Sequence, residues 1–132
     1  MKPSDPSKVF ETPTSNYWFE GDVLFVIGKK GPELSLEEQK RLTKDFLEKL
    51  DGKKICAVID VTNTSPSSRE AREYNAKVVP EMFKAIAFVA RNPVGRMLAN
   101  VYLAFKPFEF AHKVFSNEDD AVKWIRQFTE DK

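Results

Sequence analysis

Residues 54–60, Lys-Ile-Cys-Ala-Val-Ile-Asp, constrain the fold of this chain more than any other stretch. A short continuous apolar run is typical of an interior strand in a parallel sheet, where both faces of the strand are covered. This run stops on a carboxylate, and a polar loop and the start of a helix follow it. A strand that leads through a loop into a helix predicts an α/β protein with crossover connections.

The other segments extend the same alternation. Residues 16–20 and 22–29 are rich in aromatic and β-branched side chains and are separated by Gly21, which predicts a β-hairpin. Val9 and Phe10 are expected to add a short edge strand, and further strands are expected over 55–59, 85–90 and 113–115. Capping residues or a first-turn proline mark four helix starts, at Ser35, Ser67, Pro93 and Ser116. The sequence therefore predicts a mixed, mostly parallel sheet of four to five strands with an N-terminal β-hairpin and four helices.

Helix boundaries and faces follow from local patterns. Ser35 and Glu38 are spaced as a capping box, and so are Ser67 and Glu70. Pro80 is expected to kink the second helix or to stop it early. The first helix is expected to end at Asp51-Gly52 and to turn one apolar stripe inward, made of Leu36, Thr43, Phe46, Leu47 and Leu50.

Length and composition exclude several classes of protein. The chain has 132 residues, which predicts a flexible N-terminal tail over 1–7 and a single domain over 8–132. Its 21 basic and 20 acidic side chains show no basic stripe, so nucleic acid is not an expected partner. No apolar run is long enough to span a bilayer, the N-terminus does not resemble a signal peptide, and Cys56 is the only cysteine. We expect a cytoplasmic protein.

The first candidate site lies where the strand over 55–59 ends. A buried carboxylate needs hydrogen bonds, and Asp60 can accept them from the following loop in an Asx turn. Alternatively, the loop and helix start can bind an anion or carry a phosphate on serine, because helix N-terminal N–H groups favour negative charge. The residues of this candidate partner-binding, anion-binding or phosphoacceptor site are Asp60, Thr62, Ser67, Ser68 and Arg69.

The second candidate site is the apolar third helix and the loop after it. This helix has few polar positions before Lys106, so it is either core or the cover of a ligand or partner. The functional alternatives are an apolar groove and a dimer face. The flanking basic residues, Lys106, Lys113, Arg91 and Arg96, would accommodate an acidic head group. The residues concerned are Met97, Leu98, Val101, Tyr102, Phe105, Phe108 and Phe110.

Catalysis is not expected. His112 is the only histidine, and no cysteine cluster accompanies it, so the sequence predicts no metal site and no cofactor. Ser67, His112 and Asp60 could form a triad on paper, but Pro66 stands where a nucleophile elbow requires glycine. Cys56 lies inside an apolar strand, as a small buried hydrophobic residue does.

Several motifs in this order resemble the STAS domain class, which comprises SpoIIAA-like anti-sigma-factor antagonists and lipid-binding Sec14-like relatives. The nearest group is one of small bacterial STAS/Sec14-like proteins of unknown function. The resemblance covers about residues 9–128 and rests on the segments 17–24, 58–62, 68–74, 92–93 and 113–124.

The resemblance implies a SpoIIAA-like fold and a non-enzymatic regulatory or protein-interaction role, with a protein partner or a homodimer. In regulatory STAS domains a strand ends on Asp, which Asp60 matches, and a serine at the next helix start is phosphorylated, for which Ser67 lies nearest. Pro66 and Arg69 stand here in place of that motif's acidic residue and glycine. The Sec14-like relatives imply the alternative, a carrier of a small apolar or lipid-like ligand.

Overall fold

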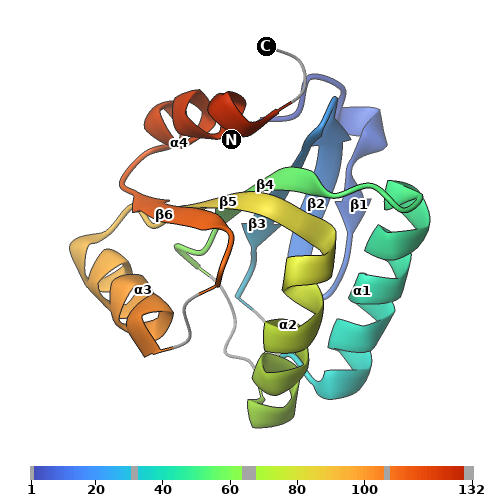
Figure 1. Ribbon diagram of the computed structural model, residues 1–132, viewed down its shortest axis with the longest axis horizontal. Helices are drawn as coiled ribbons and strands as arrows, with labels where there is room; N and C mark the ends of the chain where they lie inside the picture. Colours follow the sequence, from blue (N-terminus) through green and yellow to red (C-terminus); the bar gives the residue numbers. More distant parts are fainter. Residues whose placement is uncertain (1, 31–32, 64–67, 106–107, 130–132) are drawn as a thin grey trace.

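The computed structural model describes residues 2–30, 33–63, 68–105 and 108–129, without the side chains of 98 and 101–105. These residues form one sheet with helices on both faces (Figure 1). Its strands are β1 (Phe10–Glu11), β2 (Ser15–Glu20), β3 (Val23–Gly28), β4 (Ile55–Asp60), β5 (Phe83–Val89) and β6 (Ala111–Phe115). The α-helices are α1 (Leu36–Leu50), α2 (Arg69–Met82), α3 (Pro93–Phe105) and α4 (Glu118–Ile125), and the 3-10 helices are η1 (Pro6–Lys8) and η2 (Arg126–Phe128).

The strands are ordered in space as they are in the sequence, from β1 to β6. β1, β2 and β3 pair antiparallel, and β3, β4, β5 and β6 pair parallel. The predicted mixed, mostly parallel sheet is therefore confirmed. It has six strands instead of four to five, because the edge segment β1 pairs with β2, with Phe10 opposite Tyr17.

The three crossover helices lie on one side of the sheet. Each parallel strand lies in the sheet beside the parallel strand that follows it in the sequence. Right-handed crossovers that all step in the same direction across a sheet place their helices on the same face. Figure 1 shows α1, α2 and α3 on that side and α4 on the other. The helices α1 and α2 cover the face of the sheet on which Leu24, Ala57 and Ile86 pack.

The strand β4 lies in the interior of the sheet, between β3 and β5, as its apolar sequence predicts. Ala57 and Ile59 pack in the cluster under α1 and α2, and Cys56 and Val58 pack in the cluster under α4. This alternation is the period of two that a strand requires. Both faces of β4 are therefore buried, and its carboxyl end carries Asp60.

Three details of the helices differ from expectation. Ser68, not Ser67, caps α2: its Oγ accepts a hydrogen bond from the N–H of Ala71 at 3.1 Å, and its own N–H donates to the carbonyl of Leu34. That backbone bond holds Ser68 in the extended conformation that an N-cap needs. Ser67 lies outside the described residues. The helix α2 runs on to Met82, so Pro80 does not stop it early, and the expected kink there stays a prediction.

The cap of α4 is likewise one residue further along than expected, at Asn117 instead of Ser116. Its Oδ1 accepts from the N–H of Asp120 at 2.9 Å, and asparagine caps helices as well as serine does. In α1, Leu47 is 42% exposed, so its expected inward position is wrong. The inward face of α1 is formed instead by its buried residues, which are Gln39, Leu42, Thr43, Phe46 and Leu50.

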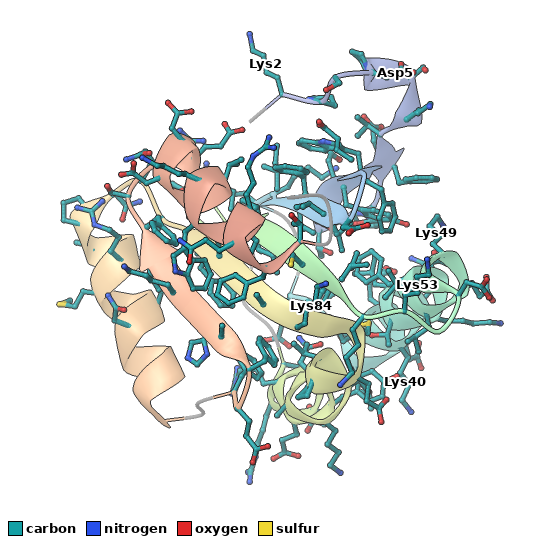
Figure 2. The ribbon with its side chains drawn as sticks, turned by 45° about the horizontal axis from the view of Figure 1, so that its top comes forward. Lys2, Asp5, Lys40, Lys49, Lys53 and Lys84 are labelled. Atoms are coloured by element: carbon teal, nitrogen blue, oxygen red, sulfur yellow. The ribbon has the colours of Figure 1, made fainter. Side chains whose placement is uncertain are left out.

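The outer side of α1 is charged and solvent-exposed. Lys40 and Lys49 project from it (Figure 2), and the ammonium of Lys49 lies 4.5 Å from the ring centroid of Phe10 on the edge strand. This cation–π contact covers an exposed aromatic ring on β1. The helix ends at Asp51, which is left-handed with φ 50°, and Gly52 follows with φ 82°.

A candidate ligand pocket at the strand ends

A pocket of about 240 Å³ lies between α1, α2 and the face of β3, β4 and β5, and its lining runs from Phe83 at the start of β5 to Gly28 and Val61 at the carboxyl ends of β3 and β4. The carboxyl ends of parallel strands are where open α/β sheets commonly bind ligands. Most of its lining is aliphatic or aromatic, and the apolar residues concerned are Leu24, Val26, Leu34, Leu42, Phe46, Ile59, Val61, Val79, Met82, Phe83, Ile86, Phe88 and Phe108, with Gly28 among them.

The polar part of the lining is small and uncharged. It consists of Thr14 and Ser15 at the start of β2, Gln39 on α1 and Asn75 on α2. The Nε2 of Gln39 donates to the Oδ1 of Asn75 and to the Oγ1 of Thr43, the latter at 3.4 Å. Gln39 is buried, and this amide pair joins the two helices within a mostly apolar pocket lining. A few placed polar groups in an apolar concavity are typical of small-molecule sites.

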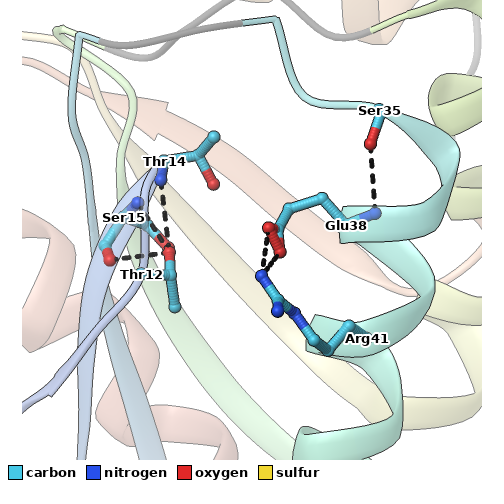
Figure 3. Close-up of polar contacts among 6 residues, drawn as sticks. All are labelled: Thr12, Thr14, Ser15, Ser35, Glu38 and Arg41. Atoms are coloured by element: carbon cyan, nitrogen blue, oxygen red, sulfur yellow. Dashed lines mark hydrogen bonds and ion pairs between the residues drawn. The ribbon is translucent and has the colours of Figure 1, made fainter.

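A hydroxyl-centred turn fixes the two polar residues at the start of β2. The Oγ1 of Thr12 accepts from the N–H groups of Thr14 at 3.3 Å and of Ser15 at 3.0 Å (Figure 3). The same oxygen donates to the carbonyl of Ser15 at 2.9 Å. The short Thr12 side chain therefore fixes the backbone of Thr14 and Ser15, the two residues that form this side of the pocket.

Capping fixes the opposite side. The Oγ of Ser35 accepts from the N–H of Glu38 at 3.2 Å, which starts α1 one turn before Gln39 (Figure 3). The carboxylate of Glu38 pairs with Arg41 one turn along, on the side of α1 toward the Thr12–Ser15 turn (Figure 3). The bond from Ser68 to Leu34 ties the start of α2 to the segment before α1. The two helices that carry Gln39 and Asn75 are thus joined at their N-terminal ends.

Asp60 lies at the same end of the sheet but on the other face. Its Oδ1 accepts from the N–H of Thr62 at 2.9 Å, which is the Asx turn that the sequence predicts. Its Oδ2 pairs with the Nε of Arg91 at 3.2 Å, and the N–H of Arg91 donates to the Oγ1 of Thr62 at 3.0 Å. Asp60 and Thr62 therefore connect the loop after β4 to Arg91, which lies just after β5. Both carboxylate oxygens of Asp60 have a bonding partner.

The remaining residues of the first candidate site are partly described. Arg69 is exposed and pairs with Glu73 one turn along α2, at 3.0 Å. Ser68 is half-buried, and its hydroxyl oxygen is used as the cap of α2. The phosphoacceptor prediction for Ser67 and Ser68 remains a prediction.

The second candidate site divides between two environments. Phe108 lines the pocket and stacks on Phe110, with ring centroids 4.8 Å apart, and Phe110 packs against the core under α1 and α2. Met97 is 58% exposed on the outside of α3, next to Val94 at 62%. The side chains of the other four, Leu98, Val101, Tyr102 and Phe105, lie outside the described ones.

Cys56 and His112 both have contacts within the fold. Burial of the Cys56 thiol raises its pKa to about 11, with smaller effects from Lys84, which lowers it, and Asp22, which raises it. The Nδ1 of His112 lies 3.0 Å from the carbonyl of Phe110, and its ring packs edge-on against Phe108.

Among the described residues, no three His, Cys, Asp or Glu side chains gather as metal ligands do. In the same part of the chain, no helix combines the length and the apolar character needed to cross a membrane.

Sequence patterns alone do not identify three residues that shape this end of the molecule. Gln39 and Asn75 occupy helix positions where a polar residue looks solvent-facing, and only the packing of α1 against α2 brings them together. Arg91 is noticed in the sequence as a flanking charge and not as the partner of Asp60, because 31 residues separate them. The single signal that could have found Arg91 is its place directly after a buried strand parallel to β4.

The arrangement is that of a SpoIIAA-like domain. A crystal structure of an uncharacterized protein of the DUF3478 family from Shewanella loihica PV-4, described as having a SpoIIAA-like fold, is similar to the chain with a TM-score of 0.60. The two are 22% identical, and the match covers 89% of each chain. The fold class that the sequence motifs indicate is therefore confirmed.

Residues 17–129 match the family described as Domain of unknown function (DUF7793), and the chain belongs to that family. No curated protein matches it.

Proposed function

We propose that this protein is a non-enzymatic binding domain that holds a compact, mostly apolar ligand in the pocket at the carboxyl ends of β3, β4 and β5. The observation that carries the proposal is a mostly apolar pocket, partly open to solvent, between the sheet and the helices α1 and α2, with four polar side chains in its lining. A concave, mostly apolar pocket with a few placed polar groups is the usual form of a small-molecule site.

The pocket volume limits the ligand. About 240 Å³ is roughly eight times the ~30 Å³ that one water molecule occupies in the liquid. It also exceeds the roughly 150 Å³ engineered apolar cavity that accepts benzene. The cavity suits a group of about eight non-hydrogen atoms, or one end of a longer chain. This proposal retains the small apolar ligand of the Sec14-like alternative and does not extend to a whole two-chain lipid.

Filling the pocket tests the proposal. Val79 lines the cavity, whereas its neighbour Val78 packs against the same core without lining it. We expect native mass spectrometry of the purified protein to show a co-purifying small apolar molecule, and Val79→Phe to abolish it. Val78→Phe is the matched control and should retain it. An empty wild-type protein that also binds no medium-chain compound at millimolar concentration would contradict the proposal.

A second candidate function is protein interaction, the regulatory role that the SpoIIAA-like resemblance implies. The observation that favours it is the pair of exposed apolar side chains on α3, Val94 and Met97, close to the half-exposed Arg91. Exposed apolar residues beside a charge are common in protein–protein contacts. In this candidate the surface of α3 contacts a protein partner or a second copy of the chain.

Light scattering with size-exclusion chromatography tests the self-association form of this candidate. We expect a dimer whose dissociation constant rises at least tenfold in Met97→Asp, whereas Lys123→Asp, an exposed position on α4, leaves it unchanged. A monomer at all concentrations would exclude the homodimer. The phosphoacceptor form is tested by intact mass from the native host with and without phosphatase treatment, and unmodified Ser67 and Ser68 under all conditions would exclude it.

A further inference from the structure

The amide pair in the pocket has unused hydrogen-bonding capacity. The Nε2 of Gln39 donates to Asn75 and to Thr43, which leaves the Oε1 of Gln39 and the Nδ2 of Asn75 without a partner among the described residues. If the oxygen and nitrogen positions of both amides are exchanged, the unpartnered atoms are again one acceptor oxygen and one donor NH₂ group. The pair can therefore satisfy a ligand group that donates and accepts at the same time.

The pocket lining is also uncharged. Its four polar residues are Thr14, Ser15, Gln39 and Asn75, and no Lys, Arg, Asp, Glu or His lines it among the described residues. Moving a charged carboxylate or ammonium out of water into such a place is far more costly than moving a neutral polar group. Two of the basic residues that the sequence suggests for an acidic head group are engaged elsewhere: Arg91 pairs with Asp60 on the other face, and Arg96 donates to backbone carbonyls.

We propose that the pocket selects an uncharged molecule whose polar end both donates and accepts a hydrogen bond, as a primary amide does, and whose apolar body fills the space between Leu42, Val79 and Ile86. This inference rests on the proposed function, because it names the class of ligand for the same pocket. It differs from the acidic head group that the flanking basic residues in the sequence suggest.

A matched pair of probes tests the inference. Hexanamide and hexanoate have the same number of non-hydrogen atoms and differ in charge at neutral pH. We expect hexanamide to bind the wild-type protein at least tenfold more tightly than hexanoate in a methyl-detected NMR titration at pH 7. Asn75→Leu should lower the affinity for hexanamide at least fivefold and remove most of the preference. Lys77→Leu, an exposed position on the same helix, is the control and should keep both affinities.

The outcomes separate the two proposals. Equal or tighter binding of hexanoate, with methyl shifts in the pocket, would overturn the neutral-ligand inference and leave the binding function in place. A preference for hexanamide that survives in Asn75→Leu would also overturn it, because the amide pair would then not be the recognising group. Binding of neither probe to the pocket would overturn both proposals.

Discussion

Replacing Asp60 with alanine is expected to destabilise the protein by about 2–3 kcal/mol. The side chain accepts from the N–H of Thr62 at 2.9 Å and pairs with Arg91 at 3.2 Å. A hydrogen bond to a charged group contributes roughly 1.5–3 kcal/mol, and its loss leaves the partly buried Thr62 N–H without an acceptor. The Arg91 side chain is 46% exposed, so the ion pair adds only about 0.5 kcal/mol. The turn bond and not the ion pair should dominate.

Asparagine at the same position separates the two contributions. Asp60→Asn keeps an oxygen for the N–H of Thr62 and loses the charge, so we expect a cost of about 1 kcal/mol. Urea unfolding followed by the fluorescence of the buried Trp18 measures both variants. A double-mutant cycle with Arg91→Ala should give a coupling energy near 0.5 kcal/mol that falls with added salt. An Asn variant as unstable as the Ala variant, or a coupling energy above about 2 kcal/mol, would refute this reasoning.

Three further predictions concern single residues. Pro80→Ala should raise the free energy of unfolding by about 1 kcal/mol in urea titrations, because proline cannot donate within α2; a destabilised variant would contradict this. Ser68→Ala should cost about 1 kcal/mol through the lost cap while leaving probe binding unchanged, and an altered affinity would show that Ser68 acts in binding. The Cys56 thiol, with its pKa raised from 9.0 to about 11, should resist alkylation at pH 8 until the protein unfolds, and its contribution to stability should be lost only as pH rises from about 9 to 11.

The fold is largely predictable from local patterns in the sequence. The continuous apolar run over 55–59 places β4 inside the sheet, and Gly21 places the hairpin. These features depend on residue periodicity and turn chemistry within a few positions, which the sequence displays directly. The caps at Ser68 and Asn117 differ from expectation by one residue, because adjacent polar residues compete for the same role and backbone bonds decide between them.

The site is less predictable because it is made by packing. Asp60 and its Asx turn follow from the sequence, since the bond spans two residues. The amide pair of Gln39 and Asn75 joins residues 36 positions apart on two helices, and its presence inside an apolar cavity depends on how those helices meet. Leu47 shows the same limit, because its apolar character suggests burial, whereas the buried face of α1 is formed by Gln39, Leu42, Thr43, Phe46 and Leu50 and Leu47 is exposed.

The most direct test of the pocket is a methyl-resolved NMR titration of the wild-type protein with hexanamide. We expect saturable chemical-shift changes for methyl groups of Leu42, Val79 and Ile86, which line the pocket. We expect none for Val23 and Ile125, which pack on the α4 face. Shifts confined to the α4 face, or no saturable shifts at all, would contradict the binding proposal.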